Sequence, residues 1–97
     1  MSKAYWIVRV SVRDEQRYPE YLAAAGPAFQ NFGAKFVVRG GACETLEGSW
    51  RPQRLVVLEF PSVGRAKEWW SSPEYREAKA LRQRTARTEM IVVEGVG

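Results

Sequence analysis

Two arginines and one glutamate form the first set of side chains that could do chemistry. Arg39 lies near the end of one predicted strand, Arg54 begins the next, and Glu47 lies in the segment between them. As a functional set, the arginines would hold a carboxylate or an enolate, and Glu47 or Tyr21 would handle a proton. As a structural set, the same charges would form an ion-pair network at the rim of the sheet. The sequence leaves both interpretations open.

An aromatic cluster forms the second set. Trp69 and Trp70 are followed, after a break at Ser71-Ser72, by Tyr75, and Tyr21 on an earlier helix can face the same gap. Aromatic walls with a few polar groups are typical of small-molecule sites, so these residues indicate a pocket between helices and sheet. In the alternative interpretation, one tryptophan belongs to the core and the other covers the junction between two helices or the edge of a dimer.

The missing residue types exclude several chemistries. The chain has no histidine and one cysteine, Cys43. It therefore lacks the Ser-His and Cys-His pairs of nucleophilic catalysis and the imidazole ligands of zinc. Cys43 is either a reactive thiol beside the Gly40-Gly41 bend or an incidental residue. We expect no metal and no cofactor.

The basic residues are mostly arginine, and the net charge is +4. This balance indicates either an anionic partner or a solvated helix face. RNA-recognition domains place aromatic residues on the open face of a similar sheet, whereas here the corresponding strand offers Leu55, Val57 and Glu59. We therefore expect no binding to nucleic acid.

The elements that must position these residues follow from the hydrophobic pattern. Alternation predicts strands over residues 4–12, 35–41, 54–60 and 88–94. Helical spacing predicts a helix over about residues 19–32, ended by Gly33, and two more that open at Ser62 and at Ser72-Pro73-Glu74. This order predicts one α+β domain over residues 1–97, with a ferredoxin-like βαββαβ fold: a four-stranded antiparallel sheet with helices on one face.

The second face of the predicted sheet is more apolar than a water-covered face should be. The residues assigned to it are Ile7, Val37, Leu55 and Val57, mixed with Arg9, Arg39 and Glu59. Each exposed aliphatic side chain would forgo about 1.5–3 kcal/mol, in a domain whose whole stability is about 5–15 kcal/mol. We therefore expect a homodimer, in which a second copy covers this face and Arg9 or Arg39 meets Glu59.

Neither an export signal nor a membrane span is predicted. Arg9 interrupts the first apolar run after five residues, 4–8, and no later stretch approaches the ~20 apolar residues that a span needs. A single cysteine fits a reducing compartment. We expect a cytoplasmic protein with no membrane partner.

Several short motifs, taken in order, resemble a known family. They are Tyr5-Trp6-Ile7-Val8-Arg9-Val10, the pair Tyr18 and Tyr21, Phe36-Val37-Val38-Arg39-Gly40-Gly41, Leu46-Glu47-Gly48-Ser49-Trp50, Glu59-Phe60-Pro61-Ser62 and Trp69-Trp70-Ser71-Ser72-Pro73-Glu74-Tyr75. Together they resemble the domain-of-unknown-function family thirteen-thirty, within the dimeric α+β barrel superfamily, over essentially the whole chain.

The resemblance implies a fold and an assembly, namely ferredoxin-like subunits whose sheets join into a barrel. It implies no settled activity, because the wider superfamily includes cofactor-free monooxygenases, muconolactone-type isomerases, stress-responsive proteins and haem enzymes. The haem enzymes use a histidine ligand, which this chain lacks.

Two hypotheses about function follow. In the first, a small dimeric protein binds an apolar or carboxylated ligand between helices and sheet, through Tyr21, Arg39, Glu47, Arg54, Trp69, Trp70 and Tyr75. In the second, the protein is a cofactor-independent enzyme of monooxygenase or isomerase type that uses Tyr21, Glu47 and the arginines.

Overall fold

The computed structural model describes residues 2–96. Its elements are β1 (Ala4–Val12), α1 (Tyr18–Asn31), β2 (Lys35–Arg39), β3 (Arg54–Phe60), α2 (Val63–Trp70), α3 (Pro73–Thr85) and β4 (Ala86–Glu94). The strands form one antiparallel sheet in the order β2-β3-β1-β4. The predicted α+β class and the ferredoxin-like βαββαβ order are confirmed.

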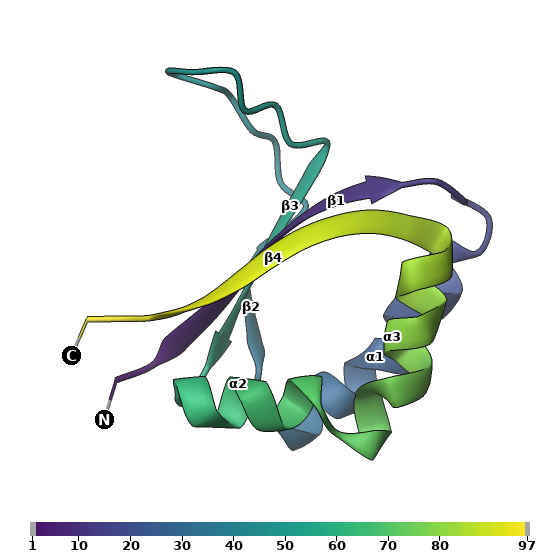
Figure 1. Ribbon diagram of the computed structural model, residues 1–97, viewed down its shortest axis with the longest axis vertical. Coiled ribbons are helices and arrows are strands. Elements are labelled where there is room, and N and C mark those ends of the chain that lie inside the picture. Colours follow the sequence, from purple (N-terminus) through teal and green to yellow (C-terminus); the bar gives the residue numbers. More distant parts are fainter. Residues whose placement is uncertain (1, 97) are drawn as a thin grey trace.

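All three helices cover one face of a curved sheet (Figure 1). In the central strand β1, every second side chain is buried beneath them, as in Trp6, Val8 and Val10. Trp69 of α2 and Tyr75 of α3 pack against this layer, with ring centroids 4.2 Å apart. The core is therefore a single aromatic and aliphatic layer between helices and sheet.

Polar side chains and prolines fix the helix ends as the sequence predicts. The hydroxyls of Ser62 and Ser72 accept hydrogen bonds from the backbone N–H of Arg65 and Tyr75, in the first helical turn where the usual intrahelical acceptors are missing. Pro73 occupies the first position of α3, where its missing N–H removes no helical bond.

A β-bulge in β2 corrects one sequence prediction. Strict alternation places Arg39 on the face of the sheet that the helices leave open. In the structure, the register shifts between Phe36 and Val38, so that Arg39 pairs with Val56, whose side chain is buried under the helices. Because one extra residue exchanges the two faces, Arg39 lies on the helical side, and Val38 takes its place on the open face.

The segment between β2 and β3, residues 40–53, is an extended arm that projects away from the helices (Figure 1). Leu46 on the arm is 95% exposed. The base of the arm is held by the side-chain carbonyl of Gln53, which accepts a hydrogen bond from the N–H of Val12 at 3.1 Å.

None of the helices within residues 2–96 is long and apolar enough to cross a membrane.

Candidate functional site: an arginine-lined cavity

A cavity of about 270 Å³ lies between α1 and the helical side of the sheet. Its walls are mostly apolar, and their largest side chains are Trp6, Leu22, Phe29 and Phe36. Four polar side chains join this lining: Tyr21, Arg39, Arg54 and Arg82. The cavity therefore combines apolar walls with three positive charges.

Arg82 is the buried charge of the site. Its side chain leaves α3 on the face that also carries Tyr75, and the residue is only 2% exposed. Its Nε donates to the hydroxyl of Tyr75 at 3.4 Å, and its Nη1 donates to the hydroxyl of Thr88. A guanidinium carries five N–H donors, so donors remain for a further acceptor.

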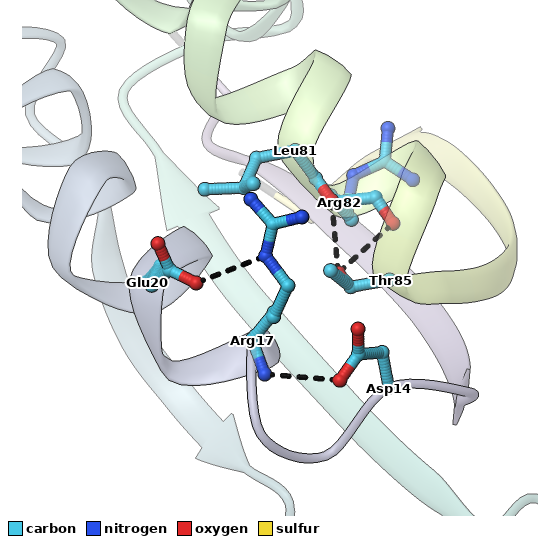
Figure 2. Close-up of polar contacts among 6 residues, drawn as sticks. All are labelled: Asp14, Arg17, Glu20, Leu81, Arg82 and Thr85. Carbon is cyan, nitrogen blue, oxygen red and sulfur yellow. Dashed lines mark hydrogen bonds and ion pairs between the residues drawn. The ribbon is translucent and has the colours of Figure 1, made fainter.

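No carboxylate within residues 2–96 forms an ion pair with Arg82. Figure 2 shows Asp14 and Glu20 near this end of α3, and both are bonded to Arg17 instead. A buried charge without a counter-ion is expensive, because its attraction to water is lost and no attraction to an opposite charge replaces it.

Two tyrosines extend the hydrogen-bonded chain from Arg82 to the cavity wall. The hydroxyls of Tyr75 and Tyr21 lie 2.9 Å apart, and Tyr21 lines the cavity. Burial raises the pKa of Tyr21 well above its ordinary value, and the neighbouring Tyr75 adds to this rise. Tyr21 is therefore a neutral phenol at ordinary pH, suited to donate a hydrogen bond and poorly suited to act as a base.

Arg54 lies across the cavity from Arg82, at the start of β3. Its Nε is buried without a hydrogen-bond partner among the described residues. Its guanidinium lies against Gly40, where an added Cβ would come within 2.6 Å of Nη1. It also lies 5.9 Å from the ring centroid of Tyr18. Burial raises the pKa of Tyr18, although the charge of Arg54 opposes this rise.

Arg39 completes the polar lining at the exposed mouth of the cavity. Its guanidinium stacks on the ring of Phe36, 3.9 Å from the centroid. This contact fixes the planar group by cation–π attraction while its edge stays available to a ligand. The four ion pairs found between described residues all lie elsewhere and include neither Arg39 nor Arg54.

The structure divides the residue set predicted from the sequence. Tyr21, Arg39 and Arg54 line the cavity, and Tyr75 stands directly behind Tyr21. Glu47 is exposed on the arm and does not line the cavity. The alternative ion-pair network of Glu47 with Arg39 or Arg54 is absent from the described residues, whose ion pairs do not include Glu47.

The two tryptophans do not line this cavity, although the guanidinium of Arg82 lies 5.7 Å from the ring centroid of Trp70. Trp69 is 1% exposed and packs in the centre of the core, against Trp6 at 4.8 Å between centroids. Trp70 is half-buried and lies, with Trp69, beside a second cavity of about 250 Å³ between α2 and β4. Tyr21 does not line that second cavity, so the single aromatic pocket predicted from the sequence is two separate spaces.

Two residues of the site were not predicted from the sequence. Arg82 follows Tyr75 by seven residues, which is two helical turns and places both on one face of α3. That spacing is visible in the sequence, but the charge pattern indicates either an anionic partner or a solvated helix face and does not single out Arg82. The sequence indicates Tyr18 only as a core residue of the first helix, and nothing in the sequence predicts its contact with Arg54.

The sequence model of the family described as "Domain of unknown function (DUF1330)" matches residues 3–96. The chain belongs to this family. The resemblance read from the motifs is thereby confirmed for this DUF1330 protein. No curated protein matches its sequence.

Solved structures similar to this DUF1330 chain show its fold. The RPA0582 protein of unknown function from Rhodopseudomonas palustris is 24% identical, with a TM-score of 0.80 over 99% of this chain and 84% of its own. A dimeric ferredoxin-like protein of unknown function from Jannaschia sp. CCS1 is 13% identical, with a TM-score of 0.70 over 96% and 99% of the two chains.

SnoaB, a cofactor-independent oxygenase from Streptomyces nogalater, has the same fold. It is 11% identical, with a TM-score of 0.65 over 100% of this chain and 96% of its own. At such identities the likeness concerns fold alone, because one fold carries many functions.

Proposed function

We propose that this protein binds a small apolar carboxylate in the cavity between α1 and the sheet. The observation that carries the proposal is the buried guanidinium of Arg82, which has no anionic partner within residues 2–96 and borders an apolar cavity. A carboxylate is the group that an arginine fork fits best, with two parallel hydrogen bonds.

The size and lining of the cavity support a small, partly apolar ligand. Ligand pockets commonly measure ~300–1,000 Å³, and this cavity of about 270 Å³ lies near the lower limit. Phe29 and Phe36 offer apolar rings to the ligand body, while Tyr21 and Arg82 offer donors to its charged end. A single aromatic ring or a chain of about six carbons matches that volume and chemistry.

Calorimetric titration with benzoate tests the proposal, with benzamide as the uncharged ligand of the same shape. We expect benzoate to bind and benzamide to bind at least tenfold more weakly, because a charge-assisted hydrogen bond contributes ~1.5–3 kcal/mol. Arg82→Met should weaken benzoate binding by a similar factor. Arg84→Met, on an exposed position of the same helix, should leave it unchanged. Equal affinity for benzoate and benzamide would show the proposal to be wrong.

A second candidate is a cofactor-independent enzyme of monooxygenase or isomerase type. The chain of donors from Arg82 through Tyr75 to Tyr21 favours it, since aligned donors in a buried site stabilise an enolate as it forms. The binding function takes precedence because the described lining contains no carboxylate to act as a base, and the raised pKa of Tyr21 opposes that role. Turnover of a bound carboxylate that Tyr21→Phe abolishes would establish the enzyme.

We also infer that two copies pair through the open face of the sheet. Ile91 and Val93 of β4 are 60% and 43% exposed there. Arg9 and Glu89 add a cross-strand ion pair at 3.6 Å within the same face. The similar protein from Jannaschia is described as dimeric. Arg39, expected from the sequence at this interface, lies instead on the helical side, so it is not part of the proposed pairing.

A further inference from the structure

The three arginines of the cavity stand at two opposite ends of it. Arg54 of β3 pairs with Val10 of β1, and Val10 pairs in turn with Thr88 of β4. These residues therefore form one row across three neighbouring strands. Since neighbouring strands lie ~4.8 Å apart, the two ends of the row are about 10 Å apart.

One guanidinium group lies at each end of this row. Arg82 donates to the hydroxyl of Thr88, so its charge lies at the β4 end. The guanidinium of Arg54 lies against Gly40, which follows β2, so its charge lies beyond the opposite end. We name these the α3 pole, formed by Arg82 with Tyr21, and the β2 pole, formed by Arg54 with Arg39.

A single carboxylate is too small to neutralise both poles. Even with its own width added, two contacts of about 2.7–2.9 Å do not reach across the ~10 Å between the ends of the row. Val10 separates the poles along the floor of the cavity, and Leu22 and Phe29 belong to the same apolar lining. One charged group at each end with an apolar connection is therefore the complementary arrangement.

We propose that the ligand is a dianion: two oxyanion groups, such as carboxylates, joined by a short apolar or aromatic segment. One group accepts hydrogen bonds from Arg82 and Tyr21, and the other from Arg54 and Arg39. The buried Nε of Arg54, which has no partner within residues 2–96, supplies an independent observation for the second group. This inference rests on the proposed function and adds the class of ligand.

Matched pairs of acids in calorimetric titration test the inference in the unmodified protein. Terephthalate carries two carboxylates, monomethyl terephthalate has the same ring and almost the same length with one, and benzoate has one at one end. We expect terephthalate to bind at least tenfold more tightly than the other two. Adipate should exceed hexanoate by a similar factor.

Single substitutions then assign each carboxylate to a pole. Arg54→Met should reduce the affinity for terephthalate to about that for benzoate. The affinity for benzoate, which is held at the α3 pole, should fall less than threefold. Arg82→Met should weaken both acids. Arg84→Met serves as the exposed control and should change neither. Because the ligand comparison in the unmodified protein needs no variant, a misfolded variant does not prevent the test.

The outcomes separate this inference from the proposed function. If benzoate binds but terephthalate and monomethyl terephthalate bind equally, the dianion is wrong and the carboxylate site stands. If Arg54→Met leaves the preference for terephthalate unchanged, the β2 pole is wrong. If no acid of the series binds, the proposed function fails, and the inference fails with it.

Discussion

We expect the buried charge of Arg82 to favour ligand binding and to lower the stability of the free protein. It is 2% exposed, its hydrogen-bond partners within residues 2–96 are two hydroxyls, and its guanidinium lies 5.7 Å from the ring centroid of Trp70. Replacing buried charge by an apolar side chain of similar length is often neutral or stabilising. A site held ready for a ligand is one place where proteins retain such unfavourable groups.

Arg82→Met should therefore abolish carboxylate binding without destabilising the free protein. We expect the free energy of unfolding to stay unchanged or to rise by up to about 2 kcal/mol, because an uncompensated buried charge is removed. Urea unfolding without ligand measures it, with Arg84→Met as the exposed control. A loss of more than about 3 kcal/mol, typical of breaking a buried charge network, would contradict this result and indicate a structural role.

The buried tyrosines set an alkaline limit on stability. Burial raises the pKa of Tyr21, and also that of Tyr75, above the ordinary value of 10.0, at which the unfolded chain releases these protons. Their contribution to the free energy of unfolding is therefore fully present below pH 10.0. It is lost as the pH rises through the folded-state pKa, because the unfolded chain releases these protons more readily than the folded protein.

Tyr21→Phe should make the alkaline fall in stability shallower. We expect the free energy of unfolding of the unmodified protein to be level from about pH 7 to pH 9 and to fall above about pH 10. Urea unfolding at a series of pH values measures both slopes. Parallel curves for the two proteins would show that Tyr21 does not contribute to this limit.

At the scale of elements, the sequence predicted those parts of the fold that depend on local periodicity. The alternation in β1 and the serine and proline signals at the starts of α2 and α3 gave the right elements, because each reflects burial or capping within a few residues. The bulge in β2 could not be located, because it depends on pairing with β3 and moves every later side chain to the other face.

The site was predicted in part for the same reason. Three of the predicted residues line the cavity, namely Tyr21, Arg39 and Arg54. The alternation nevertheless places Arg39 on the wrong face of the sheet, because it does not show the bulge. The sequence does not single out Arg82, because arginines on helices are usually solvated and its burial depends on α3 packing over β4. Glu47 lies on the arm between β2 and β3, whose path in space does not follow from the local sequence.

Gly40 directly follows β2 and lies against the guanidinium of Arg54. Its φ of +68° is in the left-handed region, and an added Cβ would lie 2.6 Å from Arg54 Nη1. Gly40→Ala should destabilise the protein by about 1–2 kcal/mol, the usual cost of that backbone conformation with a side chain. It should also displace Arg54 and weaken terephthalate binding.

Gly41→Ala is the matched control, because an added Cβ there meets nothing within 4 Å. Urea unfolding and calorimetric titration of both variants measure the two effects. Equal behaviour of the two variants would contradict the role given to Gly40.

The whole molecule leaves one face of its sheet uncovered by helices (Figure 1). The exposed aliphatic side chains of β4 on that face are the ones we expect a second copy to bury. Ile91→Glu should place a charge in the proposed interface and release monomers, since an unpaired buried charge costs several kcal/mol. Light scattering at micromolar concentration measures the mass.

Ala24→Glu, on the exposed side of α1, is the control and should leave the dimer intact. An unmodified protein that is already monomeric at that concentration would show the pairing to be wrong. Carboxylate binding is expected to survive in the Ile91→Glu monomer, because the cavity lies on the opposite side of the sheet.

A crystal structure of the protein grown with benzoate tests most directly whether the cavity is a carboxylate site. We expect the ring between α1 and the sheet, with a carboxylate oxygen about 2.7–2.9 Å from the guanidinium of Arg82 and near the hydroxyl of Tyr21. Benzoate absent from the cavity at saturating concentration, or bound there with its carboxylate turned away from all three arginines, would contradict the proposed function.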